Sequence, residues 1–169
     1  MEPAAKLRRA SDADWPVLSP LWRAVVAAGD TYFCAPDTPE SVAAAFWMPG
    51  DPAETWLAED LNIGVLGTYL LKPNQIGLGD HVANAGFMVD PVVRGRGIGR
   101  QLGEHCLARA AELGYRAMQF NAVVANNATA LALWRSLGFV IVGTVPKAFR
   151  HRQLGEIDIH IMHRFLEVP

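Results

Sequence analysis

Apolar side chains recur every three or four residues in four stretches of the chain, which is the spacing of one face of an α-helix. The longest stretch begins behind a glycine-rich turn and ends at Gly114, a residue type that often terminates helices. Pro39 stands near the start of another, where the first helical turn does not need the missing N–H. The spacing therefore predicts helices over residues 13–28, 38–47, 98–113 and 128–137.

Shorter runs of branched and aromatic residues, bounded by Gly, Pro, Asn and Asp, are typical of β-strands. Three such runs follow one another before the third helix, so strands and helices do not simply alternate. We therefore expect an α/β protein with a mixed sheet and helices on both faces. No internal repeat or linker divides the chain, so residues 1–169 are expected to form a single domain. The predicted strands cover residues 7–10, 55–59, 63–71, 81–89, 117–124, 139–145 and 157–165.

Composition narrows the range of functions. Hydrophobic residues make up 51% of the chain and charged residues 19%, which argues for a buried core and against disorder. A net charge of −2 gives no global basic field for nucleic acid. The apolar run at 63–71 is too short to span a membrane, and residues 1–9 do not resemble a signal peptide. Cys34 and Cys106 suggest neither a disulfide framework nor metal ligands, so we expect a cytoplasmic protein with no metal, membrane or nucleic-acid partner.

The segment between the strand at 81–89 and the helix at 98–113 carries the most specific signal. Three glycines alternate with other residues there and leave backbone amides open to a close-approaching ligand. The helix dipole adds partial positive charge at the same point, and three arginines add more. These features predict a pyrophosphate site made of Arg94, Gly95, Arg96, Gly97, Ile98, Gly99 and Arg100.

Two other phosphate-binding turns fit less well. A dinucleotide-binding turn is accompanied by an acidic residue about 20 positions further on, at the end of the next strand, and this chain has none there. A Walker loop needs a lysine followed by serine or threonine, and neither is present in this turn. A plain glycine-rich turn with surface arginines is the remaining alternative.

Residues 94–99 resemble the pyrophosphate signature of the GNAT acyltransferase family, in which Gln or Arg is followed by two residues, Gly, one residue, and Gly or Ala. A second block is similar to the helix that follows the fifth strand of that family. The resemblance covers nearly the whole chain and implies the GNAT fold, with about seven strands, four helices and a V-shaped splay between the fourth and fifth strands. The second block consists of Asn127, Ala130, Leu133 and Trp134, followed by Leu137, Gly138 and Phe139.

This resemblance implies that acetyl-CoA is the co-substrate and that an amine attacks it directly, with no acyl-enzyme. The pantetheine arm would pair with the backbone of Phe87, Met88 and Val89, as an added strand does. An amide of this segment, assigned to Val89, would polarise the thioester carbonyl. Asn127 and Trp134 would face the coenzyme.

The chain departs from the family at two positions. Many members carry a tyrosine that protonates the departing thiolate, whereas Trp134 can pack against the coenzyme or donate to its sulfur but cannot act as a general acid. A purely core role is the alternative for Trp134. Some relatives place a glutamate base where this chain has Ala83, so the base is unassigned, and His81, His151 and Glu59 are weak candidates.

A finer resemblance concerns the acceptor. Segments 72–74, 84–87 and 120–121 look like parts of the MPR-type acetyltransferases, which acetylate proline analogues. The resemblance implies a small amino or imino acid faced by Asn84 and Asn121, since an amide offers both a donor and an acceptor. The alternative is that these asparagines satisfy backbone groups at the splay.

Other residues complete the expected acceptor pocket. Tyr32 and Phe33, in an aromatic loop after the first helix, are expected to line it. Arg150 and Arg152, in a loop expected to close over the substrate, are candidates for holding a carboxylate. Asn127 has a plain helix cap as its alternative role.

The leading hypothesis is an N-acetyltransferase that acts on a small-molecule amine. Two alternatives stay open: a protein or peptide acetyltransferase, and a sensor that binds acyl-CoA without turnover. Homodimerisation is a further expectation, because the last strands of such folds often pack across subunits.

Overall fold

The computed structural model describes residues 5–167, in which one mixed sheet holds every strand. The spatial order is β1-β2-β3-β4-β5-β7-β6. Neighbouring strands are antiparallel except for β4 and β5, which run parallel and are joined by a crossover through α3. The strands are β1 (Lys6–Arg9), β2 (Glu54–Asp60), β3 (Gly64–Pro73), β4 (Val82–Val89), β5 (Ala117–Val124), β6 (Val140–His151) and β7 (Gly155–Phe165).

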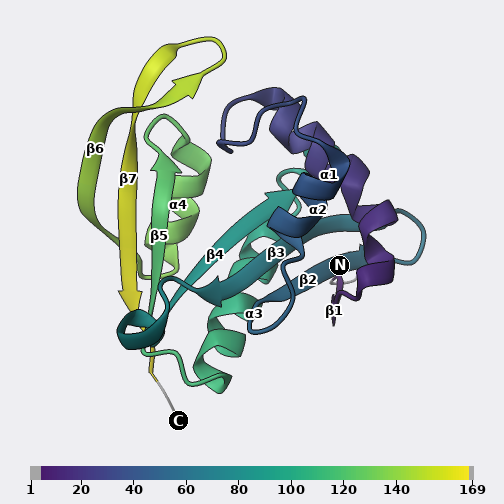
Figure 1. Cartoon of the computed structure of the whole chain (residues 1–169), viewed down its shortest axis with the longest axis horizontal. Coiled ribbons are helices and arrows are strands. Elements are labelled where there is room, and N and C mark those ends of the chain that lie inside the picture. Colours follow the sequence, from purple (N-terminus) through teal and green to yellow (C-terminus); the bar gives the residue numbers. More distant parts are fainter. Residues whose placement is uncertain (1–4, 168–169) are drawn as a thin grey trace.

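Helices cover both faces of the sheet, with α1 and α2 on one face of β3 and β4 and α3 on the other (Figure 1). α4 lies beside β5 (Figure 1). No helix within residues 5–167 combines the length and apolar character needed to cross a membrane. The helices are α1 (Trp15–Ala28), α2 (Glu40–Trp47), α3 (Ile98–Glu112) and α4 (Ala128–Ser136), with short 3₁₀ turns at Asp12–Asp14, Gly77–Gly79 and Pro91–Val93.

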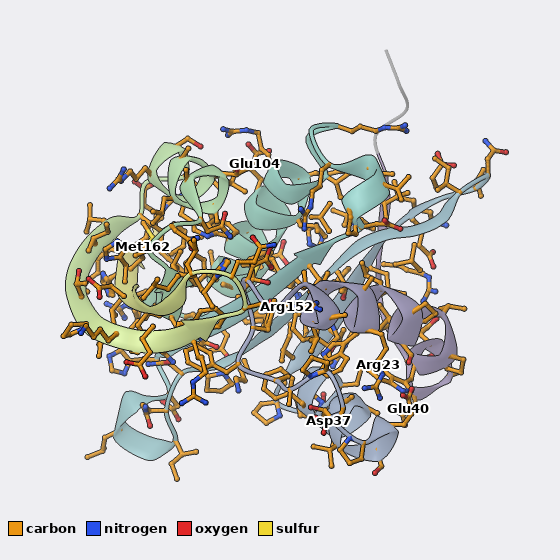
Figure 2. All side chains as sticks on the ribbon, turned by 90° about the horizontal axis from the view of Figure 1, so that it is seen from above. Arg23, Asp37, Glu40, Glu104, Arg152 and Met162 are labelled. Carbon is orange, nitrogen blue, oxygen red and sulfur yellow. The ribbon has the colours of Figure 1, made fainter. Side chains whose placement is uncertain are left out.

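Each face of the sheet has its own apolar core. The first lies under α1 and α2, and the second lies under α3 and α4. An ion pair between Arg23 Nη2 and Glu40 Oε2, at 2.6 Å, joins α1 to the start of α2 (Figure 2). The largest fully buried side chains include Trp22, Trp47 and Leu57 in the first core and Leu102, Met118 and Met162 in the second.

The predicted fold class and order of helices and strands are confirmed, but two boundaries differ in ways that affect the site. Lys72 and Pro73, expected in a turn, extend β3 and lie opposite Asn84 and Ala83. Residues 149–151, expected in a loop, end β6 and pair with β7. In both cases the partner strand supplies hydrogen bonds that the local sequence does not reveal.

The parallel strands β4 and β5 separate soon after they meet. Only Val82 and Ala83 of β4 lie in register with β5, and beyond them the two strands diverge (Figure 1). At the next position the Nδ2 of Asn84 donates to the carbonyl oxygen of Gln119 at 2.9 Å, so a side chain takes over where the backbone ladder ends. The divergence leaves backbone donors and acceptors turned toward the gap.

An ion pair between β2 and α3 is expected to set part of the acid stability. Glu54, only 5% exposed, accepts hydrogen bonds from Arg109 at 2.8 and 2.9 Å and from Trp56 Nε1 at 2.9 Å. The Arg109 guanidinium is the main cause that lowers the pKa of Glu54 from its usual 4.5 to about 2. This depressed pKa stabilises the fold above about pH 4.5, and that stabilisation is lost as the pH falls toward 2.

We therefore expect Glu54→Gln to lower the free energy of unfolding at pH 7 by about 2–3 kcal/mol. Urea titrations between pH 7 and pH 3 should also show a shallower acid limb for the variant than for the unmodified protein. Equal stability at pH 7 with an unchanged acid limb would mean that the Glu54–Arg109 pair contributes nothing.

Candidate active site

The gap between β4 and β5 opens into a cavity of about 500 Å³. One end is lined by the α1–α2 loop, α2 and β3, and the other by β5 and α4. The walls are mostly apolar and aromatic, with a few polar side chains among them. A concave, largely apolar space with few polar groups is typical of a small-molecule site.

Aromatic residues form the end of the cavity beneath α1 and α2. The predicted pair Tyr32 and Phe33 lines this end, together with Trp47. The hydroxyl of Tyr32 donates to the carbonyl oxygen of Phe87 at 2.8 Å, and its ring meets Trp47 edge-on at 5.7 Å. Burial raises the pKa of Tyr32, so its hydroxyl stays protonated as a donor. Gly86 leaves room opposite, because a Cβ there would lie 3.1 Å from the Tyr32 oxygen and would press on it.

A second aromatic group forms the other end. The ring of Trp134 lies 4.8 Å from the rings of both Phe87 and Phe120. Trp134 also belongs to the second core, so its core role and its position on the cavity are both present. Asn127 lines the cavity and caps α4, accepting from the Ala130 N–H at 3.1 Å. Only its Nδ2 is therefore left to donate to a ligand.

The backbone of β4 turns alternate residues in opposite directions. The carbonyl of Val82 and the N–H of Asp90 both bond toward β3, at 2.8 and 2.9 Å. By this alternation the polar groups of Phe87 and Val89 face the gap. Met88 instead turns its backbone toward β3, and its side chain is buried in the first core. The predicted backbone site is thus corrected at Met88, because alternation allows only every second residue to face the gap.

The glycine turn at the end of β4 is open. Gly95 and Gly97 have φ of +82° and +80°, a region that side chains disfavour. A Cβ at either position would meet no atom within 4 Å. Asp90 shapes the approach to the turn by accepting from the Val92 N–H at 2.8 Å, and Gly97 forms the N-cap of α3. The accessible helix start fits the predicted anion site.

Two residues of the predicted pyrophosphate site face inward. Ile98 is only 7% exposed and packs in the second core. A Cβ on Gly99 would lie 3.4 Å from Leu133 Cδ2 and 3.8 Å from Val89 Cγ2. Those are ordinary van der Waals distances, so Gly99 faces α4 and β4 without being forced to be glycine, and neither residue offers a ligand a side chain.

The three predicted arginines differ in their surroundings. Arg94 and Arg96 are exposed on the turn. Arg100 donates to Glu104 Oε1 at 3.3 Å and to Ser136 Oγ at 2.7 Å. Arg100 therefore joins α3 to the end of α4, and its charge is partly compensated.

The hairpin of β6 and β7 packs against the α1–α2 loop, whose residues Tyr32, Phe33 and Cys34 also line the cavity. The N–H of Arg152 donates to the Gly29 carbonyl at 3.1 Å, and its Nη1 donates to the Ala27 carbonyl at 2.8 Å (Figure 2). Phe149 meets Phe33 edge-on at 5.2 Å. The hairpin, the end of α1 and the α1–α2 loop thus form a bridge beside the cavity.

The sequence profile described as the acetyltransferase (GNAT) family matches residues 22–139, which is more than half of the chain. The chain belongs to the GNAT family. The splayed strands, the glycine turn and the second block all lie within the matched residues. The predictions of the family, its fold and an acyltransferase are confirmed.

Known proteins agree with this assignment. The structure of a GCN5-related N-acetyltransferase from Kribbella flavida is 45% identical, with a TM-score of 0.91 over 96% of this chain and 98% of that one. A GNAT phosphinothricin acetyltransferase from Sinorhizobium meliloti, solved in complex with AcCoA, shares the fold at 24% identity, with a TM-score of 0.84 over 96% and 88%. N-acetyltransferase aca1 of Schizosaccharomyces pombe is 36% identical over 103 residues, 60% of this chain and 49% of its own length. The chain thus spans about half the length of that curated relative.

Within this GNAT fold, the two predicted asparagines line the cavity from opposite strands. Asn84 bridges the splay through its bond to Gln119. Asn121 donates to Asn74 Oδ1 at 2.8 Å and accepts from Gln119 Nε2 at 2.9 Å. Each therefore reaches the cavity while bonded to a neighbour, so the substrate-facing and the structural interpretations are compatible.

The base candidates lie away from the cavity, whose lining includes no His, Asp or Glu among the described residues. His81 is exposed before the start of β4. His151 accepts the N–H groups of Gln153 and Leu154 within the hairpin turn, at 3.1 and 3.2 Å. Glu59 is paired with Arg8, from the outer strand β1, at 2.7 Å. No cluster of three or more potential metal-binding His, Cys, Asp or Glu side chains occurs within residues 5–167.

Several lining residues had no role in the sequence-based site, and Trp47, Lys72 and Thr31 are the ones that matter for its chemistry. Trp47 could have been found, because it ends the apolar face of a predicted helix. Lys72 enters the cavity only because β3 is longer than expected. Thr31 lines the cavity, and its buried Oγ1 has no hydrogen-bond partner among the described residues. Strand register places Lys72 on the cavity, and the conformation of the α1–α2 loop places Thr31 there. Neither can be predicted from the local sequence.

Proposed function

We propose that this chain transfers the acetyl group of acetyl-CoA to the amine of a small molecule, by direct attack while both substrates are bound. The observation that carries the proposal is the cavity in the splay. It runs from β4 at Phe87, two residues before that strand ends at Val89, to an aromatic pocket beneath the α1–α2 loop. One space can therefore hold a thioester and an acceptor side by side.

Three features support acetyl-CoA as the donor. The open turn at Gly95 and Gly97 offers amides and a helix start to a pyrophosphate. The N–H of Phe87 and the backbone of Val89 suit the amides of a pantetheine arm, while the Phe87 carbonyl already accepts from the Tyr32 hydroxyl. The Trp134 cluster gives the apolar part of the arm a surface to pack against. A protein with the same fold has been solved in complex with AcCoA.

The size of the cavity, about 500 Å³, favours a small acceptor over an extended peptide. We propose an amino acid or cyclic imino acid, in line with the MPR-type resemblance. Asn84 and Asn121 supply amide donors and acceptors on either side of it.

The proposed reaction needs no acyl-enzyme. The acceptor nitrogen attacks the thioester carbon, the N–C bond forms and the C–S bond breaks, and coenzyme A leaves as the thiolate. The N–H of Val89 is proposed to stabilise the oxyanion. Water takes the amine proton, since no lining carboxylate or imidazole is present among the described residues. Cys34 lines the cavity, but burial raises the pKa of its thiol, which makes it a poor nucleophile.

This chemistry predicts a pH profile set by the substrate. We expect kcat/KM to rise about tenfold per pH unit below the pKa of the acceptor amine and then to level off. The inflection should move when a second acceptor with a different amine pKa is used. Initial rates from pH 6 to pH 10 with two such acceptors measure this. One inflection common to both would point to a base on the protein and contradict the proposal.

The function is tested by following thiol release from acetyl-CoA, with mass spectrometry of the product, against amino acids, cyclic imino acids, peptides and polyamines. Acetylation of an amino or imino acid is expected. Turnover restricted to peptides or polyamines would overturn the acceptor class. Saturable acetyl-CoA binding with no product from any acceptor would favour the sensor instead.

A further inference from the structure

We infer that Lys72 holds a carboxylate of the acceptor, so that the site selects amino and imino acids over amines without an acid group. This inference rests on the proposed function and names the substrate class of the same cavity. Its basis is the position of one cation in an otherwise uncharged space.

Lys72 is the charged residue of the cavity lining, which otherwise consists of apolar, aromatic and neutral polar residues. It lies near the end of β3, directly opposite Asn84 of β4. Residues opposite one another on antiparallel strands project from the same face of the sheet. The Lys72 ammonium and the Asn84 amide thus lie on the same face of the sheet at the splay.

The ammonium has no acidic partner of its own in the described part of the chain. The ion pairs among residues 5–167 join arginines to carboxylates, and none of them includes Lys72. A cation in a partly enclosed apolar site is stabilised by an anionic ligand that brings both charge and hydrogen-bond acceptors. A carboxylate is the anion that accompanies an amine in an amino or imino acid.

The neutral polar groups fit the rest of such a ligand. The buried Oγ1 of Thr31 lacks a partner among the described residues and can donate to a second carboxylate oxygen. Asn84 and Asn121 offer amide oxygens to the amine hydrogens. A polyamine is disfavoured, because Lys72 would repel its second ammonium and no lining carboxylate would receive it.

The two arginines that could instead hold the carboxylate do not line this cavity. Arg150 and Arg152 line a separate cavity of about 650 Å³ beneath the hairpin. Arg152 is engaged by the Ala27 carbonyl, and the Tyr32–Cys34 segment borders both cavities. Arg150 is therefore the natural comparison for Lys72: it carries the same charge but borders the other space.

The experiment compares each acceptor acid with its own carboxamide, for example proline with prolinamide, in unmodified protein and in Lys72→Met, which keeps an unbranched stem of similar length. We expect the unmodified protein to favour the acid in kcat/KM, and Lys72→Met to reduce the acid-over-amide ratio by about 30-fold, mainly through KM. Lys72→Arg should restore the ratio to within about fivefold, since it returns the charge. Arg150→Met should leave the ratio unchanged.

An unchanged ratio in Lys72→Met, or a ratio lost in Arg150→Met instead, would overturn the inference. Failure of the proposed function is recognised separately, as no acetylated product from any acceptor. In that case calorimetric binding of N-acetylproline and of its carboxamide to the same variants decides the matter. Weaker binding of the acid alone in Lys72→Met would support the carboxylate site, and equal binding of both compounds by all variants would refute it.

Discussion

Gly97→Asp is expected to raise the Kd for acetyl-CoA at least about 100-fold while leaving the chain folded. Gly97 is the N-cap of α3, its φ is +80°, and a Cβ there would point into open space. A carboxylate there would fill part of the space proposed for the pyrophosphate and would repel its negative charge. Aspartate tolerates positive φ better than most residues and suits a helix start, so we expect stability to change by no more than about 1 kcal/mol.

Gly114→Asp is the matched control. Gly114 follows the other end of α3, has φ of +85°, and likewise has no atom within 4 Å of an added Cβ. The two variants therefore share the change in charge and a similar backbone conformation. Calorimetric titration with acetyl-CoA should show a near-normal Kd for Gly114→Asp. A folded Gly97→Asp that binds within about threefold of the unmodified protein would remove the turn from the coenzyme site.

Asn84→Ala should have the second-largest effect, a fall in kcat/KM of about 100-fold. The substitution removes the donor that reaches the Gln119 carbonyl at the place where β4 and β5 part. It also removes an amide from the acceptor side of the cavity. If the acceptor is no longer held at the correct angle to the thioester, most of the rate acceleration from binding the two side by side is lost. The lost hydrogen bond should lower the free energy of unfolding by about 1–2 kcal/mol.

The measurement is steady-state kinetics beside acetyl-CoA titration and urea unfolding of the same preparations. We expect the acetyl-CoA Kd to change by less than about fivefold, because the turn and the end of β4 remain intact. Asn62→Ala, on the exposed β2–β3 turn, controls for the loss of an amide and should match the unmodified protein. Near-normal kcat/KM in Asn84→Ala would show that this amide neither shapes the splay nor positions the acceptor.

The features that the sequence predicts best are local. The spacing of glycines at 95, 97 and 99 predicts an open helix start, and the structure adds that Gly95 and Gly97 have positive φ. The place of Asn127 before an apolar repeat makes it a candidate helix cap, and it caps α4 by accepting from the Ala130 N–H. Such features depend on neighbours a few residues away, which the sequence contains directly.

Features that depend on the register between strands could not be read in the same way. The backbone of Met88 faces β3 because of where β3 and β4 align, and the same alignment extends β3 to include Lys72. Arg150 and His151 lie in β6 because β7 pairs with them. A shift of one residue in either pairing would exchange the two faces, and no local pattern fixes that choice.

Contacts between distant segments form a third group. Arg152 reaches the end of α1 across 125 residues of sequence, and Arg100 reaches Ser136 across 36. Both arginines were expected to be available for anions, since sequence alone does not show which carbonyl or carboxylate lies nearby. The splay between β4 and β5 is predicted only by the resemblance to GNAT proteins, because the periodicity of the strands does not indicate it.

The central claim is that one cavity holds both substrates at once and passes the acetyl group directly between them. Initial rates with acetyl-CoA and an accepted amino or imino acid both varied test this most directly, together with the intact mass of protein incubated with acetyl-CoA alone. We predict intersecting double-reciprocal lines and an unchanged protein mass. Parallel lines with an acetyl group retained on the protein, for instance on Cys34, would contradict the account.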